Sequence, residues 1–509
     1  MQKITIKPFL FLAAFGTLLF SAGCSKDWLN PAPENELVVS DTAFNDPANA
    51  VRFVNAGYTN LLTWEQSSFA WIGVTSITSD NADKGSSPGD LGTDKDVLDA
   101  LTYTATTPSF QSAWRGNYLG VAYTNQAIAN VPQFDIDDNL KTRLTAEARF
   151  LRAYYYFNLV RMFGNIPLVD TVLSADNAAD LDKANTQVAP EVIYAFIEQD
   201  LEFALRNLPK NTEYAAADVG RATQGAAAGL LAKVSLYQEK WSRALSLTDS
   251  IINGSVGNHS LVPDYATIWR EVGENSPESL FEIQSKGTIP TAGVQQYSEV
   301  QGLRGATFNV PSSDVFSGWG FNTPSEDLDN AYEPGDVRRN ATIMHVGDVL
   351  FDGVEILSAE NPRHNYKAYV SRLQESFSGS AVVNKNVRLL RMGEIYLINA
   401  EAANELGQTA KALSSVNAIR ARARGGVSGV VPDLTTADQG ALRQAIWKER
   451  RLELAMEHDR FFDLVRTGQA GPVLRAHGKN FVEGKHERFP IPQTEIDASG
   501  GRLIQNPNY

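Results

Sequence analysis

The sequence predicts a mostly α-helical protein built from tetratricopeptide-like helix pairs, with an irregular insertion that contains short strands. Apolar residues recur at steps of three and four along several segments, which is the pattern of amphipathic helices. Two Ala-rich segments also match at a fixed shift, which aligns Ala232 with Ala400 and Ala244 with Ala412. Both are expected to form a helix, a short turn and a second helix, with small residues at the crossing. No strict period runs through the whole chain, so two unrelated Ala-rich helices remain the alternative.

Composition and charge exclude several classes of protein. The 509 residues are 43% hydrophobic and 20% charged, which is a globular rather than a disordered composition. The 59 Asp and Glu outnumber the 45 Lys and Arg, so the net charge of −14 argues against binding to nucleic acid. Cys24 is the sole cysteine, so neither a disulfide within the chain nor a thiolate zinc site can form. The six histidines contain no HExxH motif, which removes the zincin class.

Residues 1–23 predict a lipoprotein signal peptide. Lys3 and Lys7 precede an uncharged apolar run over residues 9–20, which is shorter than the ~20 residues of a transmembrane helix. Small residues follow, and Cys24 comes directly after them, as in a lipobox. We expect cleavage before Cys24 and a lipid on its thiol, which anchors the chain to a membrane without spanning it. An ordinary secreted protein with a chance cysteine is the alternative.

The mature chain is expected to divide into a tether and three regions. Residues 24–40 are polar and contain two prolines, which favours an extended, lipidated tether. Residues 41–278 form an N-terminal helical region, residues 279–391 an irregular insertion with short strands, and residues 392–509 a region of C-terminal helices and closing coil. Alternation of apolar and polar residues over 279–285 predicts the first strand of the insertion.

Helices are expected where an apolar stripe of helical period is bordered by start or stop signals. Pro47 suits a first helical position, and Gly164 suits the residue after a helix C-terminus. Consecutive aromatic residues at 154–157 surround their helix and predict burial on several sides. The expected helices are 47–63, 109–131, 140–163, 190–208, 221–239, 241–253, 392–406, 409–424 and 438–457, and residues 468–509 are expected to be coil.

A dense run of charge over residues 448–466 predicts ion pairs between helices rather than catalysis. Arg450, Glu453 and Glu457 fall on one helix face at i, i+3 and i+7. A charged row on a core-facing stripe needs partners of opposite charge on other elements. His458 is expected to be a hydrogen-bonded structural residue and not a metal ligand.

The loop of residues 80–99 carries six aspartates, and three interpretations stay open for it. Asp is common in loops because its side chain satisfies turn backbone, so a solvated polar loop is the first. A rim of acceptors for sugar hydroxyls is the second. A structural calcium site is the third, because calcium takes carboxylate oxygens as ligands. No other cofactor is indicated, and no metal ligands are assigned.

Catalytic motifs do not occur in the contexts that they need. Residues 85–89 match G-x-S-x-G, but Pro88 directly after Ser87 removes a backbone N–H that an oxyanion hole would use. No glycine-rich phosphate-binding motif occurs, so nucleotide binding has no support. A glycosidase needs two carboxylates across a cleft, and no pair among the 59 acidic residues is singled out. We therefore expect a protein that is not an enzyme and has no catalytic residues.

Seven segments spread over nearly all of the mature chain form a recognisable set. They are EARFLRAYYYF at 147–157, FGNIPL at 163–168, RLLRMGEIYL at 388–397, NAIRAR at 417–422, the charged run at 449–466, FPIP at 489–492 and QNPNY at 505–509. Together they resemble the SusD/RagB family of outer-membrane nutrient-binding lipoproteins. Two departures are small: Asn508 stands where the family usually has Gly, and Ala498-Ser499 stand where an Asn is usual.

The resemblance implies a fold, a function and a partner. The fold is four tetratricopeptide-like helix pairs, with an irregular insertion on top that carries the ligand site. The function is capture of oligo- or polysaccharide at the cell surface, on the outer membrane, and its delivery to a SusC-like TonB-dependent transporter. Peptide binding, as in RagB-like members, is the near alternative. A surface glycoside hydrolase and a plain tetratricopeptide-type interaction scaffold are the alternatives from other classes.

Aromatic residues beside polar loops are the candidates for a glycan site. Sugar rings pack their C–H faces on Trp and Tyr while their hydroxyls need polar partners, although each such aromatic could equally serve core packing. We expect the site where segment 64–100 meets segment 295–325, with Trp71 and Trp319 as stacking platforms. The expected ligand-binding residues are Trp71, Trp319, Tyr297, Phe321, Asp80, Asn81, Asp83 and Arg304.

Overall fold

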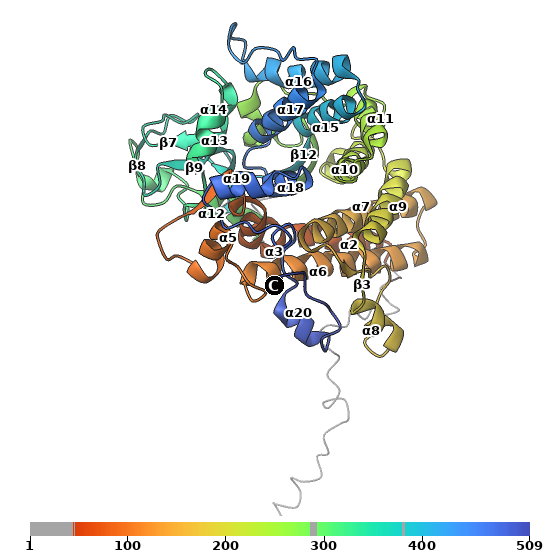
Figure 1. Ribbon diagram of the computed structural model, residues 1–509. Coiled ribbons are helices and arrows are strands. Elements are labelled where there is room, and N and C mark those ends of the chain that lie inside the picture. The colour runs from red at the N-terminus through yellow and green to blue at the C-terminus, as the bar shows by residue number, and fades with distance from the viewer. Residues whose placement is uncertain (1–43, 45, 286–292, 379–381) are drawn as a thin grey trace, which may run out of the picture. The chain divides into compact units, whose positions relative to one another are not determined.

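The computed structural model describes residues 44, 46–285, 293–378 and 382–509. The predicted signal peptide, the lipidation site Cys24 and the predicted tether therefore lie outside the described residues. The chain from Pro47 to Tyr509 forms one compact unit, in which helices predominate (Figure 1). Within the ranges described, no helix is both long and apolar enough to cross a membrane.

The long helices of the N-terminal region form where the apolar periodicity predicts them. α7 begins at Asp137, whose side chain accepts two backbone N–H hydrogen bonds, and ends before Gly164, whose φ of 73° favours glycine. Its aromatic residues are buried, and the Tyr155 hydroxyl donates to the Gly57 carbonyl oxygen at 2.7 Å. The helices are α2 (Ala48–Leu61), α6 (Pro108–Asn130), α7 (Asp138–Phe163), α8 (Ala178–Ala184), α9 (Pro190–Asn207), α10 (Gln224–Tyr237) and α11 (Trp241–Ile252).

The two Ala-rich segments form helix pairs, α10–α11 and α15–α16, and α11 packs on α15 (Figure 1). The aligned alanines Ala232, Ala400, Ala244 and Ala412 are all fully buried, which explains why the crossings need small side chains. The C-terminal helices are α15 (Met392–Glu405), α16 (Thr409–Ala423), α17 (Gln439–Glu453), α18 (Arg460–Arg466), α19 (Ala470–Ala476) and α20 (Gln493–Ala498).

Two boundary predictions in the C-terminal region are wrong. The helix expected over 438–457 ends at Glu453, because Met456 and His458 adopt positive φ values of 64° and 73° that no α-helix accommodates. The segment 468–509 is not all coil, since α19 and α20 form within it. Both are short helices whose few apolar positions give too weak a periodic signal.

The predicted insertion begins and ends with two strands that pair with each other. β4 (Ser279–Ile283) and β12 (Val387–Arg391) run antiparallel, with Ile283 opposite Val387. The pair packs on α10, where a Cβ at Gly229 would lie 2.7 Å from the Leu280 and Leu390 side chains. Between them lie α12 (Val294–Gln301), β5 (Thr307–Phe308), β6 (Phe321–Pro324), α13 (Glu326–Ala331), α14 (Val337–Thr342), β7 (Ile343–His345), β8 (Ile356–Ser358), β9 (Arg363–Asn365), β10 (Phe377–Ser378) and β11 (Val382–Val383).

The chain between α2 and α6 is built from short, irregular elements. They are α3 (Trp64–Ser67), α4 (Phe69–Ile72), the π-helical turn η3 (Gly73–Ile77), β1 (Ala82–Gly85), the π-helical turn η4 (Gly92–Asp96) and α5 (Val97–Ala100). Apart from these, β2 (Ile166–Pro167) pairs with β3 (Gln187–Val188). Single 3₁₀ turns lie at Val131–Gln133, Ala216–Asp218, Tyr265–Trp269, Glu271–Gly273, Ser312–Asp314 and Tyr366–Ala368.

The charged run at 448–466 forms buried ion pairs, as predicted. The Glu453 carboxylate lies against three guanidinium groups, those of Arg338, Arg391 and Arg422. All four side chains are at least 97% buried, and the three arginines hold the pKa of Glu453 far below its usual range despite that burial. Because a buried charge without its partner is costly, this network fixes the C-terminal helices against the insertion.

Candidate functional site

The segment after α2 and the insertion meet through a strand pair, at the junction that the sequence predicts. β1 and β6 run antiparallel, with Ala82 opposite Pro324 and Gly85 opposite Phe321. The Ser86 N–H extends the contact by donating to the Gly320 carbonyl oxygen at 2.6 Å. This pairing places α3, α4 and the loop before β6 side by side.

Four aromatic side chains form a continuous row across this junction, which we call the aromatic seam: Trp64, Phe69, Trp319 and Phe321. The Trp319 ring centroid lies 6.1 Å from that of Trp64 and 5.8 Å from that of Phe69. Phe69 in turn lies 4.6 Å from Phe321. Phe69 and Phe321 are buried, whereas Trp64 and Trp319 are half-buried and keep part of their surface open to solvent. The seam therefore has a buried base and two partly open indole rings.

Backbone contacts fix the position of Trp319. Its N–H donates to the Glu299 carbonyl oxygen of α12 at 2.8 Å. Burial raises the pKa of the Glu299 carboxyl, and the nearby Trp319 side chain opposes that shift. Gly318 is required beside it, because a Cβ there would lie 2.1 Å from the same carbonyl oxygen. The glycines around Trp319 thus serve close backbone packing.

A buried cation supports the base of the seam. The Lys95 ammonium lies 4.3 Å from the Phe69 ring centroid and donates to Asp94 at 2.6 Å and to Ser109 at 2.7 Å. Burial lowers the pKa of Lys95, and Asp94 opposes that shift. The irregular turn η4 therefore holds the aromatic base in place.

Arg304 forms a polar edge next to Trp319. Its guanidinium lies 2.9 Å from Glu360 and 2.8 Å from Asp90, and it donates to the Ser86 hydroxyl at 2.9 Å. Arg304 and Asp90 are half-buried and Glu360 is exposed, so the cluster is accessible to solvent. Planar polar groups of both charge signs thus lie beside the open indole rings.

Trp71 and Tyr297 lie away from this surface, which corrects the prediction that they contact ligand. Trp71 is 4% exposed and Tyr297 8%, and both pack against the His458 ring, at centroid distances of 6.2 and 5.5 Å. α4 continues an apolar run into the core, so the polar residues that follow Trp71 in sequence do not indicate exposure. An indole without an accessible face cannot stack on a sugar.

His458 is the structural residue that the sequence predicts. The Thr75 hydroxyl donates to the Trp71 carbonyl oxygen at 2.6 Å, so it accepts from His458 Nδ1–H at 3.1 Å. Nε2 then accepts from the Tyr297 hydroxyl at 3.0 Å. Burial lowers the pKa of His458 to about 4, so the ring is neutral at physiological pH. We call Trp71, Thr75, Tyr297 and His458 the His458 cluster.

Asp80 and Asn81 are also buried, which corrects their predicted place at the rim of the site. The Asp80 carboxylate accepts from Arg460 at 2.7 and 2.9 Å, and its pKa falls to about 2 because Arg460 and Arg451 outweigh its burial. Asn81 accepts from Arg451 at 2.8 Å. Both side chains are oriented by arginines of the C-terminal helices, so they stabilise the fold.

Four of the remaining aspartates of loop 80–99 each have a basic side chain as a separate partner. Asp83 lies 3.1 Å from His477, and the lysine partners are Lys95 for Asp94, Lys84 for Asp96 and Lys479 for Asp99. In the described part of the chain, no group of three or more His, Cys, Asp or Glu side chains could hold a metal ion. The carboxylates of this loop are thus dispersed among separate ion pairs.

Phe321 belongs to the buried base of the seam, so of the predicted aromatics only Trp319 is partly exposed. Of the predicted polar residues, Arg304 and Asp83 are partly accessible. The prediction omitted Phe69, Glu299 and Lys95, and it did not select Trp64 as a contact. Trp64 could have been selected, because it follows the end of a predicted helix and precedes Glu, Gln and Ser.

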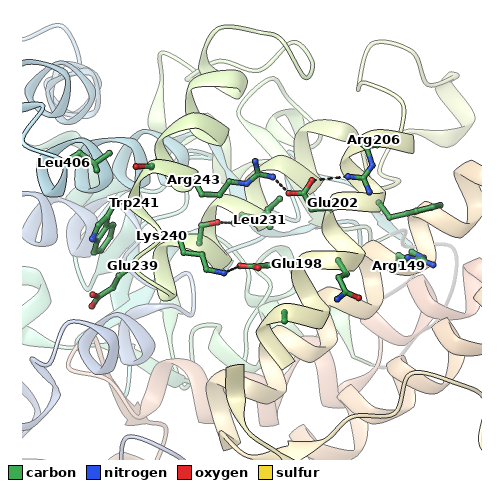
Figure 2. A pocket seen from close by; sticks show the side chains of 15 residues that line it. Arg149, Glu198, Glu202, Arg206, Leu231, Glu239, Lys240, Trp241, Arg243 and Leu406 are labelled. Atoms are coloured by element: carbon green, nitrogen blue, oxygen red, sulfur yellow. Dashed lines mark hydrogen bonds and ion pairs between the residues drawn. The ribbon is translucent and has the colours of Figure 1, made fainter. Parts of the chain in front are cut away.

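A concavity lies on the helical face, between α9 and the start of α11 (Figure 2). Its volume is about 1070 Å³, and its lining includes Phe203, Leu231 and Trp241. Lys240 pairs with Glu198 and Arg243 with Glu202, so ion pairs cross the groove between the two helices (Figure 2). Because these charges already satisfy one another, the groove offers a ligand fewer free polar groups than its size suggests.

Comparison with known proteins gives one consistent set of relatives. The model of the SusD family matches residues 277–509, and the model described as "starch-binding associating with outer membrane" matches residues 27–236. A SusD-like protein P2 of Formosa agariphila is 28% identical, over 97% of this chain and 98% of its own. A SusD-like protein of Bacteroides ovatus is 26% identical, over 100% of this chain and 92% of its own.

Solved structures agree with this set. A laminarin binding SusD-like protein superposes with a TM-score of 0.76 and 28% identity, covering 91% of this chain and 99% of its own. The surface glycan-binding protein A of Bacteroides fluxus gives a TM-score of 0.75 and 26% identity, with coverage of 91% and 99%. The predicted helical fold with short strands is confirmed by these similarities.

Proposed function

Because the chain belongs to the SusD/RagB family, we propose that it is a non-catalytic glycan-binding protein of the outer membrane surface, with the aromatic seam as its ligand site. The observation that carries the site is the pair of half-buried indole rings, Trp64 and Trp319, beside the Arg304 cluster. Open aromatic faces pack on the C–H faces of sugars, and the adjacent guanidinium and carboxylates are partners for ring hydroxyls.

The site proposal favours the seam over the helical groove. The seam offers two half-buried indole rings that pack against other aromatic side chains, so little side-chain entropy is lost when a ligand binds. The groove presents flexible Lys and Arg side chains that already pair with glutamates across it. We therefore assign glycan contact to Trp64, Trp319 and Arg304.

A binding panel tests the function. We expect the mature chain to bind at least one polysaccharide. Laminarin and starch come first, because one similar structure is described as laminarin binding and one matched family model as starch-binding. The same panel includes peptides, and product analysis by reducing-end assay accompanies it. Binding of peptides alone would favour the RagB-like alternative, and release of reducing ends in proportion to added protein would contradict a non-catalytic role.

The proposal includes a lipid anchor on Cys24 and delivery of the bound glycan to a SusC-like TonB-dependent transporter. The support is family membership together with the order of charged, apolar and small residues before Cys24. We expect Cys24→Ala to move the protein from the membrane fraction to the soluble fraction. Equal membrane association of variant and wild type would contradict the anchor. Co-purification with the transporter from outer membranes tests the partner.

A further inference from the structure

A small polar cavity lies apart from the aromatic seam, where the N-terminus of α10 meets β4. Its volume is about 130 Å³, and it shares no lining residue with the seam. The segments 211–223 and 275–282 form its walls, and His259 lies between them. At ~30 Å³ for each water molecule, it has room for about four waters or for one molecule of about six non-hydrogen atoms.

His259 presents unused hydrogen-bonding capacity in this cavity. The side chain is 93% buried, and among the described residues neither Nδ1 nor Nε2 has a hydrogen-bond partner. The ring packs closely against two glycines, because a Cβ at Gly225 would lie 2.3 Å from Nε2 and one at Gly257 3.1 Å. A buried imidazole without partners costs free energy, so a bound molecule that satisfies it is expected.

Ser276 adds a second buried group of this kind. Its hydroxyl is buried and unpartnered within the described residues, and it lines the same cavity. A hydroxyl both donates and accepts, and a neutral imidazole offers one donor and one acceptor. The ring is neutral because burial lowers the pKa of His259, and the backbone at Ser279 and Pro277 opposes that shift without reaching hydrogen-bonding geometry.

The charged side chains of the cavity wall already have partners, so they do not indicate an ionic ligand. Arg221 is paired with Asp218 at 2.8 Å and with Glu147 at 2.9 Å. Glu282 accepts from the Asn275 N–H at 3.2 Å and from the Asn386 amide at 2.8 Å. An anion would face the Glu282 carboxylate, and a cation would face a guanidinium, so a neutral molecule fits best.

The remaining polar groups of the wall already satisfy one another. The Asn211 amide exchanges two hydrogen bonds of 2.8 Å with the Asn258 backbone, and the Tyr214 hydroxyl donates to the Ala222 carbonyl oxygen. These contacts fix the walls, so the recognition falls to His259 and Ser276. Adjacent hydroxyls on a short carbon chain or on one sugar residue can each donate and accept, which matches these two groups.

We propose that this cavity binds a small neutral polyol, or the hydroxyl-bearing edge of one sugar residue, through His259 and Ser276. The site is separate from the aromatic seam, so the proposal does not depend on glycan binding there. Glycerol and erythritol represent the free polyol, and methyl glucoside represents the sugar residue.

Histidine side-chain NMR on the full mature chain tests the site, because the sequence has only six histidines. The histidine signal that is missing from the spectrum of His259→Phe is assigned to His259. We expect glycerol, erythritol or methyl glucoside to move that signal saturably, and which of them does so distinguishes a polyol from a sugar. Ser276→Ala should weaken the response about threefold to tenfold, the effect of losing one hydrogen bond. Trp319→Ala, a control in the seam, should leave the response unchanged.

Two further measurements keep the test decisive. If His259→Phe does not fold, Gly225→Ala replaces it, since its Cβ displaces the imidazole and should abolish the saturable shift. 1-Propanol has the carbon skeleton of glycerol without adjacent hydroxyls and should have no effect. A His259 signal that no polyol or sugar moves, an equal response to 1-propanol, or ordered water alone in crystals soaked in all three ligands would overturn the proposal.

Discussion

The two sides of α4 use the same residue types for different purposes. Phe69 faces the aromatic seam, and Trp71, two residues later and about 200° around the helix, enters the His458 cluster. Trp319 keeps an open face in the seam, whereas Trp71 is 4% exposed. Trp71 lies between the apolar Ala70 and Ile72, and Trp319 lies between Gly318 and Gly320. The partners that each indole meets in the fold decide whether it can bind a ligand.

The largest expected effect is a loss of stability from a substitution in the His458 cluster. Trp71→Ala removes a buried aromatic side chain from the His458 cluster, so the free energy of unfolding should fall by about 3–5 kcal/mol. Urea unfolding followed by circular dichroism measures it. Trp319→Ala is the matched variant on the seam side and should cost much less. An equal loss for both variants would remove the distinction between the two regions.

His458 should contribute to the pH dependence of stability in the acidic range. The pKa of His458 is about 4 in the folded state, against about 6.5 when unfolded, so protonation favours unfolding. The contribution of His458 to the free energy of unfolding is complete above about pH 6.5. It declines by up to about 3 kcal/mol as the pH falls toward 4. This pKa of His458 already includes the electrostatic effects of the neighbouring Glu457, Asp459 and Lys367.

Urea unfolding of wild type and His458→Gln between neutral pH and pH 4.5 separates this contribution from that of other titrating groups. The stability difference between the two proteins should shrink as the pH falls. A difference that is independent of pH would show that His458 does not titrate in this range.

A smaller effect is expected at the polar edge of the seam. Arg304→Ala removes the cation that organises Asp90 and Glu360, so glycan affinity should fall severalfold. Stability should change by less than about 1 kcal/mol, because the ion pairs are partly solvated. Arg339→Ala is the control, since Arg339 pairs with Asp329 elsewhere in the insertion. Equal affinities of the Arg304 and Arg339 variants would place the ligand away from this edge.

The smallest effect is expected in the helical groove. Lys240→Ala breaks an exposed ion pair with Glu198, which contributes about 0–1 kcal/mol to stability. Glycan affinity, measured by calorimetry, should equal that of wild type. A large loss of affinity in this variant would move the ligand site from the seam to the groove.

Much of the scaffold follows from local sequence signals. The apolar stripe of α7 and Gly164 predict a helix whose observed bounds differ from the expected ones by two residues or fewer. The charged row of Arg450, Glu453 and Glu457 predicts ion pairs, because a charge on a core-facing stripe must find a partner. In these cases, periodicity and charge act within one element, so a single sequence contains the information.

The candidate site depends on contacts between distant segments. The junction of 64–100 with 295–325 was predicted, but the choice of open residues was not, because Trp71 meets His458 and Asp80 meets Arg460 across more than 370 positions. A polar residue that looks solvated in sequence can be paired by an arginine from another helix. The exposure of Trp64 and Trp319 can be judged only when the pairing of β1 with β6 is known.

The central claim is that Trp64 and Trp319 bind glycan while the folded scaffold does not depend on their open faces. Calorimetric titration of wild type, Trp64→Ala, Trp319→Ala and Trp241→Ala with the polysaccharide that the panel identifies tests it most directly. Each seam variant should bind at least about tenfold more weakly, a loss of about 1.4 kcal/mol, with a melting temperature close to that of wild type. Trp241→Ala, in the helical groove, should bind normally. Wild-type affinity in both seam variants, or their early melting, would contradict the assignment of the seam as the ligand site.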